Sequence, residues 1–274
     1  MKAIPFYKMS GSGNDFIIID NRDHAIQEKM LQKMIIGSCR RKMSVGADGF
    51  ILVEESETTD FRWRFYNSDG SRAEMCGNGA RCVSRFAFLN GIAGPELSFE
   101  TDVGVITAQI VGNRVKIKMT DPVDLKEGCK LLLEEKILNY HFINTGVPHV
   151  VIGTEDADTV DVLGIGKAVR YHEAFSPAGT NVNFIQVSEE NTLAIRTYER
   201  GVEDETLACG TGSVAAALIA ARQNDFDSPV KVMTRSGEYL RIFFKQSNGS
   251  FTDVFLEGDA RVIYTGELWE EAWA

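Results

Sequence analysis

Two cysteines of this chain stand in the same local setting. Cys76 lies in AEMCGNGARCVSRFAF and Cys209 lies in TLACGTGSVAAALIAA, so each is followed by Gly-x-Gly and a run of helix-forming residues. The first turn of a helix carries unpaired N–H groups and a partial positive charge, which favour a thiolate and can bind a carboxylate. The pattern therefore predicts two reactive thiols, each at the start of a helix.

Two such thiols can exchange protons at one carbon atom. A thiolate on one face removes a proton and a thiol on the other face returns one, which inverts a stereocentre without a metal or an organic cofactor. Helix-start N–H groups can hold an α-carboxylate as it becomes enediolate-like. The candidate donors are the backbone N–H groups of Gly77, Asn78, Gly210 and Thr211. Close packing of a helix on a sheet would explain the glycines but not a cysteine in both copies.

The other cysteines point to no further chemistry. Cys39, Cys82 and Cys129 form no C-x-x-C pair and have no histidine at zinc-binding spacing, so no metal site is predicted. Cys82 falls in the interior of the first cysteine helix, where core packing is the expected role.

Both thiols must be positioned by a helix in a strand-rich surrounding. The sequence predicts the first helix over 77–89 and the second over about 211–223. Short strands precede and follow both helices, so each half is predicted to be a strand-rich unit with one central helix. The predicted class is α+β, with two similar domains.

An offset repeat supports this duplication. Thr101 and Gly104 follow Cys76 at the same distances at which Thr234 and Gly237 follow Cys209. The two halves therefore share one local plan.

Asp121-Pro122 is the predicted boundary between the halves. It divides the chain into an N-terminal domain, 1–121, and a C-terminal domain, 122–261, and the tail 262–274 is expected to return to the first domain as a strand. The polar stretch 124–129 is predicted to be a linker or a first turn.

Composition excludes several classes of protein. The 274 residues are 44% hydrophobic and 25% charged, which is typical of a globular protein. The net charge of −10 argues against nucleic acid as a partner. The sequence shows no signal peptide and no membrane-spanning run, so a cytoplasmic protein with no membrane association is expected.

The order of several segments resembles the diaminopimelate epimerase family. The segments are KMSGSGNDFIIID, NSDGSRAEMCGNGARC, TGVPHVV and YERGVEDETLACGTGSVAAA, and the resemblance covers almost the whole chain. It implies an isomerase that interconverts LL- and meso-diaminopimelate without pyridoxal phosphate, in lysine and peptidoglycan precursor biosynthesis. It also implies two barrel-like domains related by pseudo-twofold symmetry, a small amino-acid substrate and a homodimer.

The resemblance implies roles for individual residues. Cys76 and Cys209 would be the two bases, and His149 and Glu199 would support their proton transfers. The substrate would be held by Asn14, Asn67, Asn181 and Arg200, with Arg200 on the distal carboxylate. Simpler interpretations stay open: turn formation for Asn14 and Asn67, a surface ion pair for Glu199-Arg200, and a structural role for His149.

One position departs from the family pattern. Many members read Gly-Asn-Pro-His where this chain reads Gly146-Val147-Pro148-His149, and Val147 cannot replace a polar contact to substrate. A racemase or epimerase of the same fold for another amino acid is therefore the alternative function. A non-catalytic redox protein that pairs Cys76 with Cys209 is a remote one.

Overall fold

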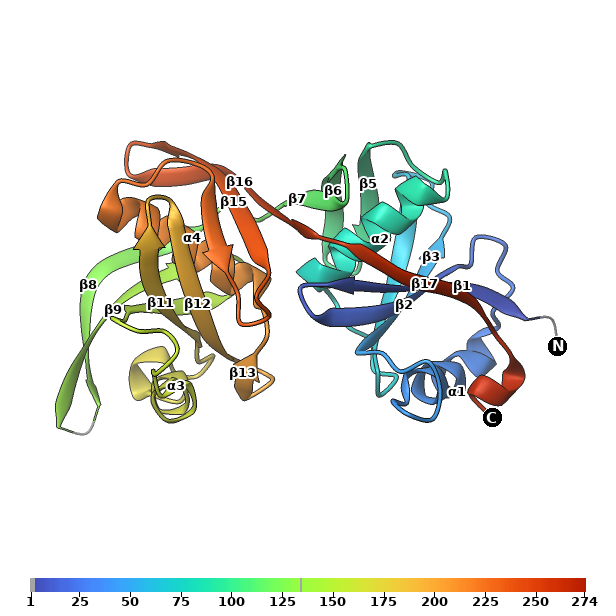
Figure 1. Cartoon of the computed structure of the whole chain (residues 1–274), viewed down its shortest axis with the longest axis horizontal. Helices are drawn as coiled ribbons and strands as arrows, with labels where there is room; N and C mark the ends of the chain where they lie inside the picture. Colours follow the sequence, from blue (N-terminus) through green and yellow to red (C-terminus); the bar gives the residue numbers. More distant parts are fainter. Residues whose placement is uncertain (1–2, 134) are drawn as a thin grey trace. The chain divides into compact units, whose positions relative to one another are not determined.

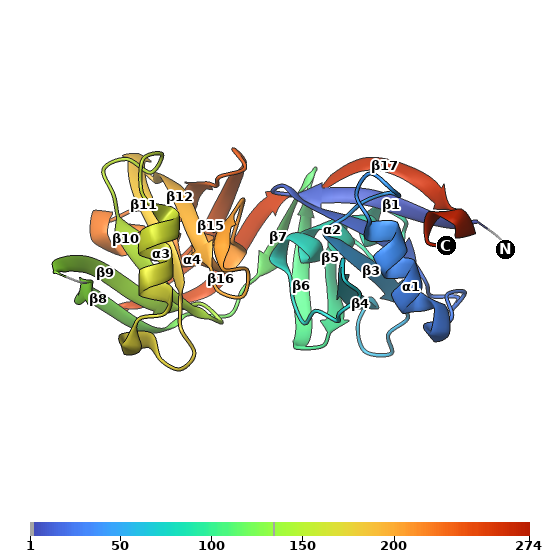
Figure 2. The same cartoon turned by 90° about the horizontal axis from the view of Figure 1, so that it is seen from below.

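The computed structural model describes residues 3–133 and 135–274, which form two compact units. Unit 1 comprises Met1–Ile117 together with Gly258–Ala274, and unit 2 comprises Lys118–Glu257. In Figures 1 and 2, each unit is a strongly curved sheet that surrounds one helix, α2 in unit 1 and α4 in unit 2.

Unit 1 is an eight-stranded sheet that begins with the last strand of the chain. The order is β17-β1-β2-β3-β4-β5-β6-β7, and only the β2–β3 and β4–β5 pairs are parallel. The strands are β1 (Ile4–Gly11), β2 (Asn14–Asp20), β3 (Gly49–Glu54), β4 (Phe61–Asn67), β5 (Glu96–Thr101), β6 (Gly104–Val111), β7 (Arg114–Lys118) and β17 (Arg261–Leu268). The helices are α1 (Glu28–Cys39), α2 (Gly77–Leu89) and the short η2 (Glu270–Ala272).

Unit 2 repeats this arrangement. Its order is β8-β9-β10-β11-β12-β14-β15-β16, with the short β13 also on β12, and only the β10–β11 and β12–β14 pairs are parallel. The strands are β8 (Val123–Leu133), β9 (Lys136–Asn144), β10 (Pro148–Gly153), β11 (Asn181–Glu189), β12 (Thr192–Glu199), β13 (Asp204–Thr206), β14 (Val230–Met233), β15 (Tyr239–Ser247) and β16 (Ser250–Asp259). The helices are α3 (Val162–Arg170), η1 (Glu173–Phe175) and α4 (Gly210–Asn224).

The two units share the sequence of strand pairings and helix insertions. In each, a helix lies in the connection of the first parallel pair (α1 or α3), and the cysteine helix lies in the connection of the second (α2 or α4). A hairpin then follows, at Thr101–Gly104 in unit 1 and after Thr234 in unit 2, with Gly104 and Gly237 at positive φ. The predicted α+β class with two similar domains is confirmed. The repeated spacing of Thr101 and Gly104, and of Thr234 and Gly237, corresponds to the hairpin that follows the cysteine helix in each unit.

The prediction of a linker or a first turn over 124–129 is wrong. These residues belong to β8, which pairs antiparallel with β9. The register of this pair shifts twice, and Asp124 and Gly128 adopt positive φ, so irregular pairing accommodates the polar residues. Leu131 further along the strand is buried in the core of unit 2, which holds the strand in place.

The central helices are largely buried, although α2 contains Arg81 and Arg85 and its last two residues, Phe88 and Leu89, are exposed. In α4, every residue of the run Val214–Ala221 is buried, and the many alanines allow strands to approach from several directions. In α2, the buried Arg81 is satisfied by the Asp259 carbonyl, the Ser12 hydroxyl and the Asn78 amide oxygen. No helix in the described part of the chain is long and apolar enough to cross a membrane.

Candidate active site

Cys76 is the residue that caps the N-terminus of α2. Its Sγ accepts a hydrogen bond from the Gly79 backbone N–H at 3.5 Å. The thiol in turn donates to the Asn14 amide oxygen Oδ1, at a sulfur–oxygen distance of 3.6 Å. The thiol thus lies between a backbone donor and a side-chain acceptor.

Asn14 is held in one orientation by a carboxylate cluster. Its Nδ2 donates to Asp48 Oδ2 at 2.7 Å, and Arg41 Nη2 donates both to Asp48 Oδ1 at 2.8 Å and to Asp15 Oδ1 at 2.7 Å. Because an ionised carboxylate only accepts hydrogen bonds, the Asn14 NH₂ group must face Asp48. The Asn14 carbonyl oxygen therefore has to face Cys76.

Cys209 caps the N-terminus of α4 in the same way. Its Sγ accepts from the Gly212 backbone N–H at 3.4 Å and lies 3.6 Å from the Thr211 hydroxyl. Burial, followed by the charge of Glu199, raises the pKa of the Cys209 thiol to about 12. The Glu199 carboxylate lies close enough to this thiol for each group to shift the pKa of the other.

Glu199 stands at the end of β12, and it forms no ion pair with Arg200 or another cation among the residues that the structure describes. Its Oε2 accepts from the Thr206 hydroxyl at 2.8 Å. Burial raises the pKa of Glu199, and the hydrogen bonds from Thr206 and Cys209 oppose that increase. A carboxylate with these contacts can take up or return the proton of the adjacent thiol.

Arg200 and Asn181 lie together in unit 2. The Arg200 backbone N–H donates to Asn181 Oδ1 at 2.8 Å, and its guanidinium Nη1 donates to the Ala178 carbonyl at 3.1 Å. Asn181 Nδ2 donates to the Pro148 carbonyl at 3.2 Å. The amide of Asn181 thus ties the end of β12 to the start of β10.

His149 is fully buried beside Asn181 in the parallel β10–β11 pair. Its Nδ1 lies 3.1 Å from Asn183 Nδ2, and its Nε2 has no hydrogen-bond partner among the described residues. Burial, followed by the charge of Arg200, lowers the pKa of His149 to about 3. Asn183, which the sequence prediction omitted, contacts the candidate residue His149. The alternation of β11 could have indicated it, because residues 181 and 183 face the same side of a strand.

The remaining predicted residues occupy the starts of α2 and α4 and a turn. Asn67 ends β4, and its Nδ2 donates to the Ser71 hydroxyl at 3.0 Å, which is the contact expected of a turn residue. The Asn78 amide oxygen accepts from Arg81 at 2.9 Å, so its side chain is committed to the interior. Gly77 and Gly210 are the first residues of α2 and α4, and Thr211 follows Gly210.

The structure sorts the predicted site residues into two local groups. Unit 1 brings Asn14 to Cys76, at the start of the helix that holds Gly77 and Asn78. Unit 2 brings Glu199 and Thr211 to Cys209, and Asn181 to both His149 and Arg200. Within residues 3–133 and 135–274, no group of three or more His, Cys, Asp or Glu side chains could hold a metal ion.

Solved structures with this fold include enzymes that act on small molecules. A phenazine biosynthesis protein of the PhzF family from Bacillus anthracis matches with a TM-score of 0.74 at 17% identity, covering 98% of this chain and 100% of its own. A probable proline racemase from Agrobacterium radiobacter matches with a TM-score of 0.66 at 12% identity, covering 97% of this chain and 93% of its own. The protein therefore has the fold that these PhzF-family and proline racemase structures share.

Sequence comparison narrows the class to one family. The family model described as diaminopimelate epimerase matches residues 6–125 and 141–263. The diaminopimelate epimerase of Aquifex aeolicus is 45% identical over 277 residues, covering 97% of this chain and 98% of that protein. That of Chlorobaculum tepidum is 43% identical over 264 residues, covering 95% and 99%. The chain belongs to the diaminopimelate epimerase family and is an isomerase.

Proposed function

We propose that this protein interconverts LL- and meso-diaminopimelate by a two-base mechanism, in lysine and peptidoglycan precursor biosynthesis. The observation that carries the proposal is the matched setting of two thiols. Each caps a central helix, and each sulfur lies within hydrogen-bonding distance of a backbone N–H and of a side-chain oxygen. The names of the relatives supply the substrate.

The reaction moves one proton off and one proton onto the α-carbon. A thiolate takes the α-hydrogen, so that an S–H bond forms as the C–H bond breaks, and the electron pair delocalises into the α-carboxylate. The thiol of the other cysteine then protonates the opposite face and becomes a thiolate. Each positioned acid or base contributes about 10²- to 10⁴-fold to the rate. The sequence of steps uses no pyridoxal phosphate.

Glu199 is the proposed proton acceptor for Cys209. A carboxylate in contact with the thiol can remove its proton, whereas the Asn14 amide beside Cys76 can only accept a hydrogen bond. Backbone N–H groups at the starts of α2 and α4 are the proposed donors to the α-carboxylate. Arg200 is proposed to bind the distal carboxylate, with Asn14, Asn67 and Asn181 as further substrate contacts.

Solvent exchange tests the proposal directly. With LL-diaminopimelate in deuterium oxide, we expect deuterium at the α-carbon and formation of the meso isomer. Cys76→Ala and Cys209→Ala should each abolish epimerisation, because inversion needs a group on both faces. Cys82→Ala is the control and should keep most activity, since Cys82 is buried within α2. An active Cys76→Ala enzyme would exclude the mechanism.

A substrate panel addresses the departure at Val147. The Val147 carbonyl accepts from the Thr145 backbone N–H at 3.2 Å, and its side chain offers no polar contact. If LL-diaminopimelate is the substrate, it should exchange its α-hydrogen much faster than amino acids that lack a distal carboxylate. Faster exchange with a simple amino acid would favour a racemase, and no exchange with any would favour a redox role for the thiols.

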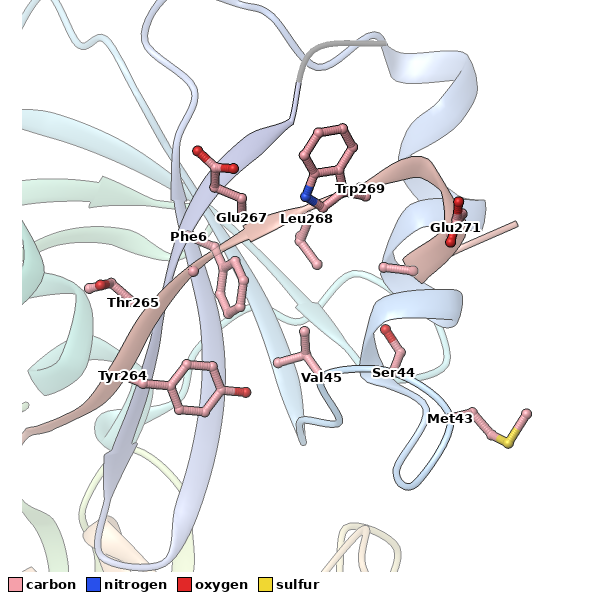
Figure 3. Close-up of a pocket in the computed structure, with 12 residues that line it drawn as sticks. Phe6, Met43, Ser44, Val45, Tyr264, Thr265, Glu267, Leu268, Trp269 and Glu271 are labelled. Atoms are coloured by element: carbon pink, nitrogen blue, oxygen red, sulfur yellow. The ribbon is translucent and has the colours of Figure 1, made fainter.

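A homodimer is the proposed assembly, and an open surface groove on unit 1, lined by both apolar and polar side chains, supports it. The groove has a volume of about 450 Å³ and contains none of the predicted site residues. Figure 3 shows Tyr264 and Trp269 along its β17 side and Met43 on the neighbouring loop; their exposed fractions are 44%, 61% and 72%. Exposed apolar side chains gathered at one groove are typical of an interface. Light scattering should give twice the chain mass, and Trp269→Glu should lower it.

A further inference from the structure

The hydrogen bonds around Asn183 determine which nitrogen of His149 carries a proton. Asn183 is fully buried on β11, and both hydrogens of its Nδ2 are used. One is donated to the Val150 carbonyl at 2.9 Å, and the other points to His149 Nδ1 at 3.1 Å.

The orientation of the Asn183 amide is fixed from both ends. The Val150 carbonyl can only accept, so it requires the NH₂ group of Asn183. The Asn183 oxygen, Oδ1, accepts from the Thr197 hydroxyl at 3.0 Å. An exchanged amide would place two oxygens against each other at Val150, which is costly in a buried site.

A fixed donor at Nδ1 has one consequence for a neutral imidazole. Nδ1 must be the acceptor, so the ring proton must reside on Nε2. Nε2 is buried and has no partner within the described residues. A buried N–H without a partner is costly, so such a donor points to a ligand that binds it.

We propose that Asn183 is a positioning residue that holds His149 as the neutral Nε2–H tautomer, so that His149 donates a hydrogen bond to a substrate carboxylate and is not a base. The roles of His149 toward the substrate rest on the proposed function, whereas its tautomer does not. Protonating His149 would direct Nδ1–H at the Asn183 NH₂ group, and the nearby positive charge of Arg200 also opposes it. A neutral imidazole can still stabilise developing negative charge on an oxygen atom. The role implied by the family resemblance, support of cysteine proton transfer, is thereby narrowed to binding.

The same amide also contacts the start of the Cys209 helix. A Cβ atom added at Gly212 would lie 2.4 Å from Asn183 Oδ1, so the helix approaches this amide closely. Gly212 is the residue whose N–H donates to the Cys209 sulfur. Asn183 therefore links the orientation of His149 to the position of the thiol.

Nitrogen NMR of the whole protein tests the tautomer without any assay of activity. In ¹⁵N-histidine-labelled protein, we expect His149 to show a protonated Nε2 and an unprotonated Nδ1, unchanged between about pH 5 and 8. Loss of the signal in His149→Gln assigns it. If that variant does not fold, His24→Gln, His141→Gln and His172→Gln assign it by elimination. An Nδ1–H tautomer, or titration of His149 in this range, would overturn the proposal.

Two substitutions separate a donor from a base. Gln retains an N–H donor near the position of Nε2 but cannot act as a base, so His149→Gln should keep at least about tenfold more epimerase activity than His149→Ala. Equal loss in both folded variants would contradict the donor role. In the Asn183→Asp variant, the new carboxylate can accept a hydrogen bond from His149 Nδ1–H. The NMR signals of His149 should therefore titrate within the pH range tested. Absence of titration in the folded variant would count against positioning by Asn183. If epimerase activity is never found but the wild-type tautomer is as expected, the proposed function fails and the tautomer assignment stands.

Discussion

The two thiols share a backbone donor and differ in the side chain that accepts from them. Cys76 donates to a neutral amide whose orientation is fixed by Asp48, whereas Cys209 contacts the Glu199 carboxylate. The amide favours the thiol form of Cys76 without being able to remove its proton. The negative charge of Glu199 contributes to the raised pKa of Cys209, and transfer of the thiol proton to this carboxylate would neutralise that charge.

Arg200 provides a residue-scale prediction on substrate binding. Arg200→Lys should lower kcat/KM for LL-diaminopimelate by about 100-fold, because a lysine ammonium cannot reproduce the planar fork that pairs with a carboxylate. A remote contact also positions the reacting carbon, so kcat should fall as well as affinity. The control is Arg222→Lys at the far end of α4, where Arg222 contacts Glu127. Near wild-type kinetics for Arg200→Lys would remove the distal-carboxylate role.

His149 provides a residue-scale prediction on pH. The pKa of His149 falls from an ordinary 6.5 to about 3 on folding. Between these two pH values, the unfolded chain binds a proton at His149 and the folded protein does not. Stability from this group is complete above 6.5 and is lost as the pH falls toward 3. The free energy of unfolding of the wild type should therefore decrease more steeply on acidification than that of His149→Gln, by up to about 1.4 kcal/mol per pH unit. Urea denaturation at several pH values measures how the free energy of unfolding of each protein depends on pH. The same pH dependence in both proteins would contradict the lowered pKa of His149.

At this scale, the sequence predicted the helix-start setting of the two cysteines better than the contacts around the other candidate residues. The duplicated Cys-Gly-x-Gly segments were sufficient to find Cys76 and Cys209 and their helix-start setting. Asn183 was missed because its importance depends on partners from β10, β12 and α4, which the strand register brings together. Asn67 illustrates the opposite case, since its observed contact with Ser71 is the one that a turn alone would explain.

At the scale of elements, the approach of α4 to β11 is set by one glycine. Gly212→Ala places a Cβ atom 2.4 Å from Asn183 Oδ1, so the helix start or the amide must shift. We expect a loss of about 1–3 kcal/mol in the free energy of unfolding, as for other overpacked sites, and a lower kcat. Gly153→Ala at the end of β10 is the control, because nothing lies within 4 Å of its added Cβ atom. Thermal unfolding compares the Gly212→Ala and Gly153→Ala variants. Equal Tm values would show that the protein accommodates the close contact with Asn183 without loss of stability.

The helices were predicted more accurately than the strands that begin unit 2. The helix predicted over 77–89 matches α2, because a capping cysteine and Asn90-Gly91 define both of its ends. β8 escaped prediction because its polar first half has no alternating pattern, and its pairing with β9 depends on irregular register. Local pattern determines a helix, whereas a bulged strand is determined by its neighbour.

At the scale of the whole molecule, the last residues of the chain complete the unit that the first residues begin. β17 pairs with β1, and Trp273 packs in the core cluster that includes α1 residues. A Cβ atom at Gly37 would lie 2.5 Å from the Trp273 Cα atom, so the chain end fits closely on α1.

Trp273 therefore provides a prediction at this scale. Trp273→Ala should lower the free energy of unfolding by about 3 kcal/mol or more, because a buried aromatic side chain is replaced by a cavity. Trp269→Ala is the matched control, since Trp269 is 61% exposed and should change monomer stability little. Denaturant titration at low protein concentration distinguishes the two, and equal midpoints would show that the chain end adds nothing to unit 1.

The return of β17 to β1 also affects how the protein is made. A ribosome synthesises the chain from its N-terminus, so unit 2, which is continuous from Lys118 to Glu257, is synthesised before β17 of unit 1. Until then, β1 presents an unpaired edge to other nascent chains. The unit whose synthesis begins first is thus completed only after the whole of unit 2 has been made, and during that interval β1 can pair with the wrong strand.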